Sequence, residues 1–127
     1  MRSIIILCVF PALIFGAASI NVKRYPVELQ QTYDLFVNRC SPCHGLESTI
    51  NSQYVLPSYY KEMVQEMKEL PDSGISQSDA DKIYEFLVYD AYKRHRRELR
   101  DALKALPPEK KEQEQQALKE IRDKYQS

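Results

Sequence analysis

The residues with the clearest chemical potential are Cys40, Cys43 and His44, in the stretch NRCSPCHG. Two cysteines separated by two residues, with a histidine directly after the second, fit three chemistries. They can coordinate zinc, carry out dithiol exchange or attach a haem covalently. The rest of the chain distinguishes between these uses.

Zinc and dithiol chemistry both fit the surroundings poorly. A structural zinc ion takes four ligands in a tetrahedron, and beyond the motif the only other histidine is the distant His95. A thioredoxin-like dithiol begins a helix in a βαβ unit, whereas these cysteines end a predicted helix in a chain without predicted strands. In a c-type haem, Cys40 and Cys43 each join one vinyl group and His44 becomes the proximal ligand. We therefore predict one covalently attached haem c.

The N-terminus predicts export. Arg2 is followed by an apolar run over 4–15 and by small residues over 16–19, which is typical of a secretory signal peptide over 1–18. The run is shorter than the roughly 20 residues of a membrane span. We expect cleavage, no stable membrane span afterwards and a periplasmic protein, since c-type haem is attached outside the bacterial cytoplasm. An uncleaved anchor is the alternative.

The composition of the mature chain favours a single all-α domain. About 109 residues remain, with 17 basic and 18 acidic side chains, so the charge indicates no nucleic-acid partner. Only two glycines remain, and helix-forming residues are abundant. The sequence contains neither a glycine-rich phosphate loop nor a nucleophile beside a base, which argues against an enzyme.

Apolar spacing predicts four helices separated by a loop over 41–57 and a turn at 71–74. They are expected at 27–40, from an N-cap at Ser58 to Pro71, from a capping box at Ser76–Asp79 to 106, and at 109–125. The last helix has a narrow apolar seam and is expected to fold back on its predecessor as a hairpin, or to pair with a second chain. The predicted organisation is a signal peptide (1–18), a haem domain (19–92) and a helical C-terminal extension (93–127).

The runs LFVNRCSPCHG and IYEFL together resemble class I monohaem c-type cytochromes. The resemblance covers roughly residues 27–92 and implies a cytochrome c-like helical domain around one covalent haem. It implies that the first and last core helices cross, with Phe36 packed near Phe86. Thr32 stands where the family often has a glycine, which implies a wider crossing.

The sixth iron ligand is predicted from a narrower resemblance. YKEMVQEM, followed by Ile75-Ser76, is similar to a small subgroup of monohaem cytochromes with a distal methionine on the helix after the CxxCH loop. This implies Met67 as distal ligand. Met63, His95 and an open position remain alternatives, and either methionine could instead be a core residue.

Further apolar and aromatic residues are expected to line the haem, and Pro42 to shape the attachment loop. The lining residues are Phe36, Val37, Tyr54, Leu56, Pro57, Tyr60, Val64, Ile83 and Leu87.

The expected function is one-electron transfer with redox proteins as partners. The alternatives are a haem subunit docked in a larger redox complex through its C-terminal extension, and a gas-binding haem protein with an open distal site. The basic run Lys93, Arg94, Arg96 and Arg97 could dock an acidic partner or form a solvated helix face. Residues 93–125 could also mediate dimerisation.

Overall fold

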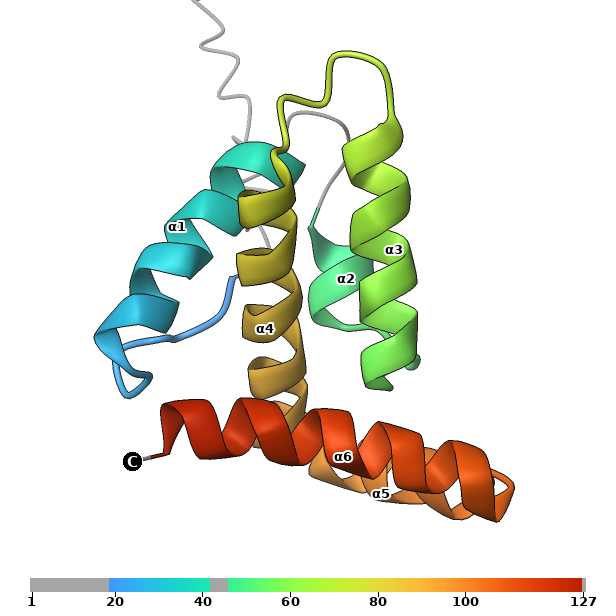
Figure 1. Ribbon diagram of the computed structural model, residues 1–127. Coiled ribbons are helices and arrows are strands. Elements are labelled where there is room, and N and C mark those ends of the chain that lie inside the picture. The colour runs from blue at the N-terminus through green and yellow to red at the C-terminus, as the bar shows by residue number, and fades with distance from the viewer. Residues whose placement is uncertain (1–18, 42–45, 127) are drawn as a thin grey trace, which may run out of the picture.

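The computed structural model describes residues 19–41 and 46–126, which form six helices and no strand (Figure 1). This confirms the all-α prediction. The predicted signal peptide lies outside the described residues. The helices are α1 (Val27–Cys40), α2 (Glu47–Ile50), α3 (Pro57–Glu69), α4 (Gln77–Arg94), α5 (Arg96–Lys104) and α6 (Pro108–Tyr125).

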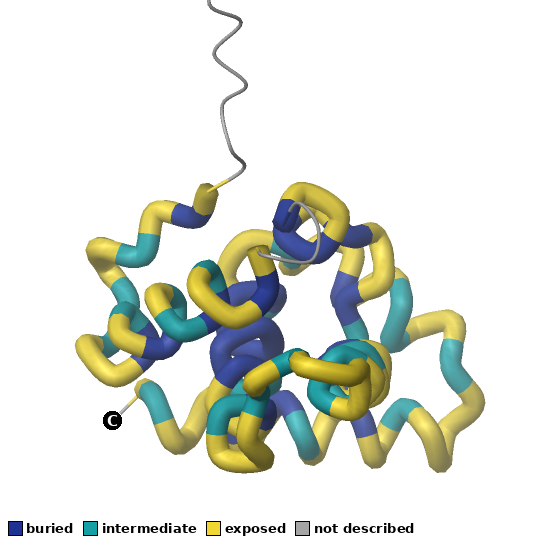
Figure 2. The backbone as a smooth tube through the Cα atoms, turned by 90° about the horizontal axis from the view of Figure 1, so that it is seen from above, coloured by how far each residue is buried: buried dark blue, intermediate teal, exposed yellow. Residues whose placement is uncertain are grey.

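Helix α4 is the centre of the molecule. It packs against α1, α3, α5 and α6, and eight of its residues are buried. Figure 1 shows α1 and α3 on either side of α4, with α5 and α6 across its C-terminal end. Buried backbone segments lie in the middle of the molecule, and exposed segments lie at its periphery (Figure 2). No helix among the described residues is long and apolar enough to cross a bilayer.

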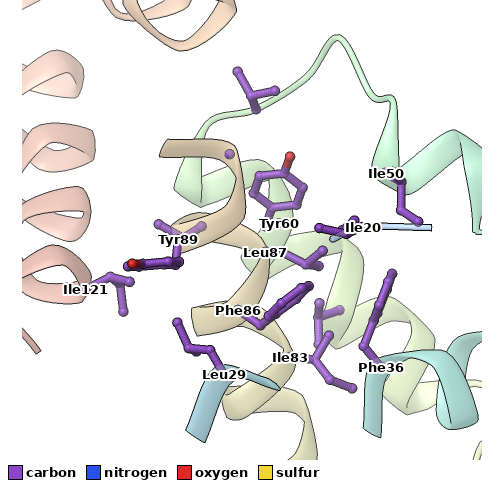
Figure 3. Close-up of a cluster of buried hydrophobic side chains, with 14 of the residues drawn as sticks. Ile20, Leu29, Phe36, Ile50, Tyr60, Ile83, Phe86, Leu87, Tyr89 and Ile121 are labelled. Atoms are coloured by element: carbon purple, nitrogen blue, oxygen red, sulfur yellow. The ribbon is translucent and has the colours of Figure 1, made fainter. Parts of the chain in front are cut away.

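An aromatic cluster joins α1 to α4. The ring centroids of Phe36 and Phe86 lie 5.9 Å apart (Figure 3). The ring centroid of Tyr33 lies 5.6 Å from that of Phe86. The predicted contact between Phe36 and Phe86 is therefore present. Thr32 is buried at this crossing, and its hydroxyl donates a 2.9 Å hydrogen bond to the Glu28 carbonyl in its own helix. Its polar group is thus satisfied without a partner on α4.

The N-terminus of α4 has the predicted capping box. The Asp79 N–H donates to the Ser76 hydroxyl at 3.0 Å, and the Ser76 N–H donates to the Asp79 carboxylate at 3.5 Å. These bonds satisfy two amides that would otherwise lack partners and fix where the central helix begins.

The prediction of one helix from Ser76 to residue 106 is wrong. Helix α4 ends at Arg94, His95 has φ −114° and ψ 41°, and α5 begins at Arg96. At this bend Arg94 Nη2 donates to the Ile50 carbonyl at 2.9 Å, and His95 Nε2 lies 3.0 Å from the same oxygen. The bend coincides with contacts to a residue distant in sequence, which apolar spacing alone does not predict.

The region before α3 also differs from the prediction. The expected loop contains the short helix α2, and α3 begins with Pro57 rather than after an N-cap at Ser58. Proline suits the first helical position because its missing N–H would have no partner there. No side chain of α3 caps its N-terminus; instead the Ser58 N–H donates to Glu114 of α6 at 3.0 Å.

The C-terminal helices share the core of the preceding segment. Helix α6 folds back along α5, as predicted, and also packs against α3 and α4. Leu99, Leu118 and Ile121 belong to the same buried cluster as Phe36 and Phe86. Near the chain end, the Tyr125 hydroxyl donates to Glu85 of α4, whose carboxylate also pairs with Lys124 at 2.9 Å.

Candidate functional site

The first cysteine of the motif ends α1. Cys40 is the last residue of that helix and is 7% exposed. Pro42, Cys43 and His44 lie outside the described residues. Of the motif, the described residues therefore include Cys40, together with the helix α1 that precedes it.

Contacts to the start of α4 hold this end of α1. Arg39 Nε lies 3.7 Å from the Asp79 carboxylate. The turn before α4 also lies close to Arg39. A Cβ atom placed on Gly74 would be 3.5 Å from the Arg39 guanidinium. Gly74 has φ +66°, a conformation that favours glycine. The C-terminal end of α1 and the N-terminal end of α4 are thus neighbours.

Met67 lies in the last turn of α3, and Cys40 ends α1. Figure 1 shows the C-terminal ends of these two helices at the same end of the molecule. The connection from this turn leads directly into α4 beside Arg39. Met63 and Met67 are both partly buried and pack against the core. Since they are four residues apart, Met67 lies one helical turn closer to the Cys40 end.

Most of the predicted lining residues come together from α1, α3 and α4 in one apolar cluster (Figure 3). Val37 and Leu56 are half-buried beside it, whereas Tyr54 is 60% exposed. Pro57 is buried at the opposite end of α3 from Met67, about 15 Å away along the helix. The buried members are Phe36, Pro57, Tyr60, Val64, Ile83 and Leu87.

Tyr60 places a polar atom within this cluster. The residue is 2% exposed. Burial raises the pKa of its hydroxyl far above the ordinary value, and the negative charge of Asp90 adds to the shift. Tyr60 therefore remains neutral at physiological pH.

A buried carboxylate organises the opposite end of α4. Asp90 accepts hydrogen bonds from the Tyr25 hydroxyl at 2.6 Å and from Arg94 Nε and Nη2 at 2.7 Å. Burial, followed by the bond to Asp90, raises the pKa of Tyr25 well above its usual range. Through Arg94 the network also holds the Ile50 carbonyl, six residues after His44. It therefore anchors the segment that follows the motif.

This network was not predicted from the sequence, because Arg94 was expected to belong to a basic run on the surface. The spacing of Asp90 and Arg94 was the available signal, since opposite charges four residues apart meet on a helix face. The part that Ile50 plays could not be predicted in this way, because it contributes its backbone carbonyl, which every residue has.

The structure places His95 far from the cysteine. Its ring nitrogen meets the Ile50 carbonyl at the C-terminal end of α4. Asp79, which neighbours Arg39, lies sixteen residues earlier, or about 24 Å along the helix axis. This separation favours Met67 over His95 as a candidate distal ligand.

Protein-family models, curated proteins and solved structures were each compared with this chain, and none of them matches it.

Proposed function

We propose that this protein is an exported c-type cytochrome with one covalent haem and that it carries single electrons. Cys40 and Cys43 would form the two thioether links, His44 would be the proximal ligand and Met67 the distal ligand. The motif CSPCH after an export signal carries this proposal. The position of Cys40 at the end of α1, at the same end of the molecule as Met67, supports it.

The residues of the described core are suited to a porphyrin. Phe36, Ile83 and Leu87 provide buried apolar surface from α1 and α4. Tyr60 adds a neutral hydroxyl rather than a charge. An apolar shell keeps water away from the iron and influences the redox potential of a bound haem.

When bound, the haem supplies an iron that alternates between the ferric and ferrous states. The chain's part is to hold that iron in both states with little rearrangement. The His44 imidazole gives a nitrogen ligand. The soft thioether of Met67 favours ferrous iron and raises the potential relative to a second histidine. Packing of α1 and α3 against α4 keeps the elements that carry Cys40 and Met67 in place.

The experiment is production of the full chain in a bacterium with a haem-attachment system, followed by mass spectrometry of the exported protein. The wild type is expected to carry one haem that survives denaturation and acidic organic extraction. Cys40→Ser combined with Cys43→Ser should abolish attachment, whereas Cys8→Ser, within the predicted signal peptide, should have no effect. A wild type without covalent haem would contradict the proposal and would favour zinc binding or dithiol exchange at the motif.

One observation favours docking in a larger complex as a second role. Helices α5 and α6 form a groove with cationic walls at the end of the molecule away from Cys40.

A further inference from the structure

The groove between α5 and α6 has an apolar floor and cationic walls. Its volume is about 790 Å³. Leu99, Leu103 and Leu118 contribute the floor, and Tyr92 also lines the groove. Leu99 and Leu118 are buried, whereas Leu103 is half-buried. Six cationic residues and one acidic residue, Asp123, also line it. The cationic residues are Arg96, Arg100, Lys104, Lys111, Lys119 and Arg122.

The cations form a row on each side. Arg96, Arg100 and Lys104 are spaced four residues apart on α5. On α6, Lys111 and Lys119 are eight residues apart, with the neutral Gln115 between them. Residues at four-residue spacing lie along one helix face, about 6 Å apart. The floor leucines lie between the two rows.

Much of this positive charge is not neutralised within the chain. Arg100 and Lys119 lie 3.5 Å and 2.5 Å from the carboxylates of Asp101 and Asp123. For the other four cations, no carboxylate of the described residues lies within ion-pair distance.

Two of the cationic side chains, Arg96 and Arg122, lie over the ring of Tyr92. The Arg122 guanidinium lies 4.7 Å from its ring centroid and that of Arg96 lies 5.4 Å away. A hydrogen bond with Gln126 lowers the pKa of the Tyr92 hydroxyl, and the charges of Arg122 and Arg96 lower it further. The groove end therefore has a positive local potential.

We propose that this groove binds an acidic amphipathic helix of a partner protein. Helices α5 and α6 provide two of the three helices of a small bundle, and the partner would supply the third. Apolar residues of that helix would cover the leucine floor, and carboxylates beside them would pair with the two cationic rows.

A second copy of this chain fits the groove less well. The exposed side of α6 carries acidic residues, Glu109, Glu112 and Glu120, but Gln113, Gln116 and Ala117 lie between them. These residues offer little apolar surface to cover the leucine floor. Charge complementarity alone would pair the two faces, but covering the part of the floor that is still exposed, chiefly Leu103, requires a partner with an apolar residue opposite it.

Helices α5 and α6, which line the groove, cross the C-terminal end of α4, whereas the end of α1 that carries Cys40 lies beside the N-terminal end of α4 (Figure 1). A partner bound along α5 and α6 would leave the Cys40 end accessible for electron exchange. The groove would thus hold the protein in an assembly without covering that end. Binding in the groove does not require the proposed function, because none of its residues belongs to the candidate haem site.

Binding can be measured with a fluorescent synthetic peptide of about three heptads, with leucines at the seam and glutamates beside it. The mature full-length protein is titrated against it by fluorescence anisotropy. We expect saturable binding that weakens as salt is raised, because surface charges are screened. A matched peptide with lysines in place of the glutamates should not bind.

Variants of the groove locate the site. Arg96→Glu with Lys111→Glu should weaken binding at least tenfold, and Leu103→Asp should also weaken it. The control, Lys68→Glu with Lys82→Glu, reverses the same number of charges elsewhere and should bind within twofold of wild type. Circular dichroism would show that each variant keeps its helices.

Three results would overturn the proposal. The first is equal loss of affinity in the groove variant and the control variant. The second is absence of peptide binding together with binding to vesicles that contain anionic phosphatidylserine, which would assign the groove to a membrane surface. The third is a concentration-dependent dimer, in sedimentation, that the groove variant abolishes. In each case covalent haem attachment, assayed separately, would be unaffected.

Discussion

At the level of single residues, the buried carboxylate of Asp90 accepts three hydrogen bonds from neighbouring side chains. It is held by two bonds from the Arg94 side chain and one from Tyr25. The Asp90 side chain is 4% exposed and that of Arg94 is 30% exposed. Because the carboxylate has little access to water, these donors replace the hydrogen bonds that water would otherwise provide.

Replacing Arg94 should therefore destabilise the fold. We expect Arg94→Met to lower the free energy of unfolding by about 2 kcal/mol, because a buried charge loses its main partner. Urea denaturation followed by far-UV circular dichroism would measure this. Arg97→Met, on the exposed surface nearby, should change stability by less than about 0.5 kcal/mol. Equal losses in the two variants would show that the Asp90 pair contributes nothing beyond a surface charge.

At the element scale, α6 supplies the cap that α3 lacks. The carboxylate of Glu114 accepts the Ser58 N–H across the helix interface. A negative charge at a helix N-terminus is also favoured by the helix dipole. The C-terminal helix therefore stabilises a helix that carries the candidate distal ligand.

Loss of this cap should destabilise the protein. Glu114→Ala is expected to lower the free energy of unfolding by about 1.5 kcal/mol, since a charged acceptor is removed from a part-buried hydrogen bond. Glu112→Ala removes the same charge from the exposed side of α6 and should have an effect below about 0.5 kcal/mol. Chemical denaturation of both variants tests this. An unchanged unfolding midpoint in Glu114→Ala would contradict it.

Local sequence patterns predicted some elements accurately and missed others. The spacing of Leu29, Tyr33 and Phe36 predicted α1, and Ser76 with Asp79 predicted the start of α4. The bend at His95 and the first turn of α3 were missed. Both involve tertiary contacts, with the carbonyl of Ile50 and the carboxylate of Glu114, which leave no periodic signal in the sequence.

At the scale of the whole molecule, the two proposed activities lie at opposite ends of α4. Cys40, Cys43 and His44 were predicted from their spacing and Met67 from a resemblance, and all four roles remain predictions. The cationic groove was only partly foreseen. The basic run drew attention to Arg96, but Lys111 and Arg122 join it only because α6 folds back.

Stability should fall at alkaline pH because several tyrosines are shielded from water. Burial raises the pKa values of Tyr25, Tyr60, Tyr84 and Tyr125. In the unfolded chain, a tyrosine ionises near pH 10. Above that pH the unfolded state loses protons that the folded state keeps, so the unfolded state is favoured. The stabilising contribution is complete below about pH 9 and declines as pH rises past about 10.

The unfolding midpoint in urea, measured between about pH 8 and pH 11, should therefore decrease with pH. Lysines also titrate in this range, so the control is Tyr25→Phe, which removes one shielded hydroxyl. Its midpoint should fall less steeply than that of the wild type. Identical slopes in the two proteins would contradict the assignment to Tyr25.

His44 and Met67 are proposed to hold the iron of a single haem. These two ligands can be tested by the optical and low-temperature magnetic spectrum of the oxidised protein, beside those of Met67→Ala and Met63→Ala. We predict a low-spin wild type with the weak long-wavelength charge-transfer band of a ferric haem with a thioether ligand. The band should disappear in Met67→Ala and remain in Met63→Ala. A high-spin wild type, or a band that persists in Met67→Ala, would contradict the ligand assignment and favour an open distal site or Met63.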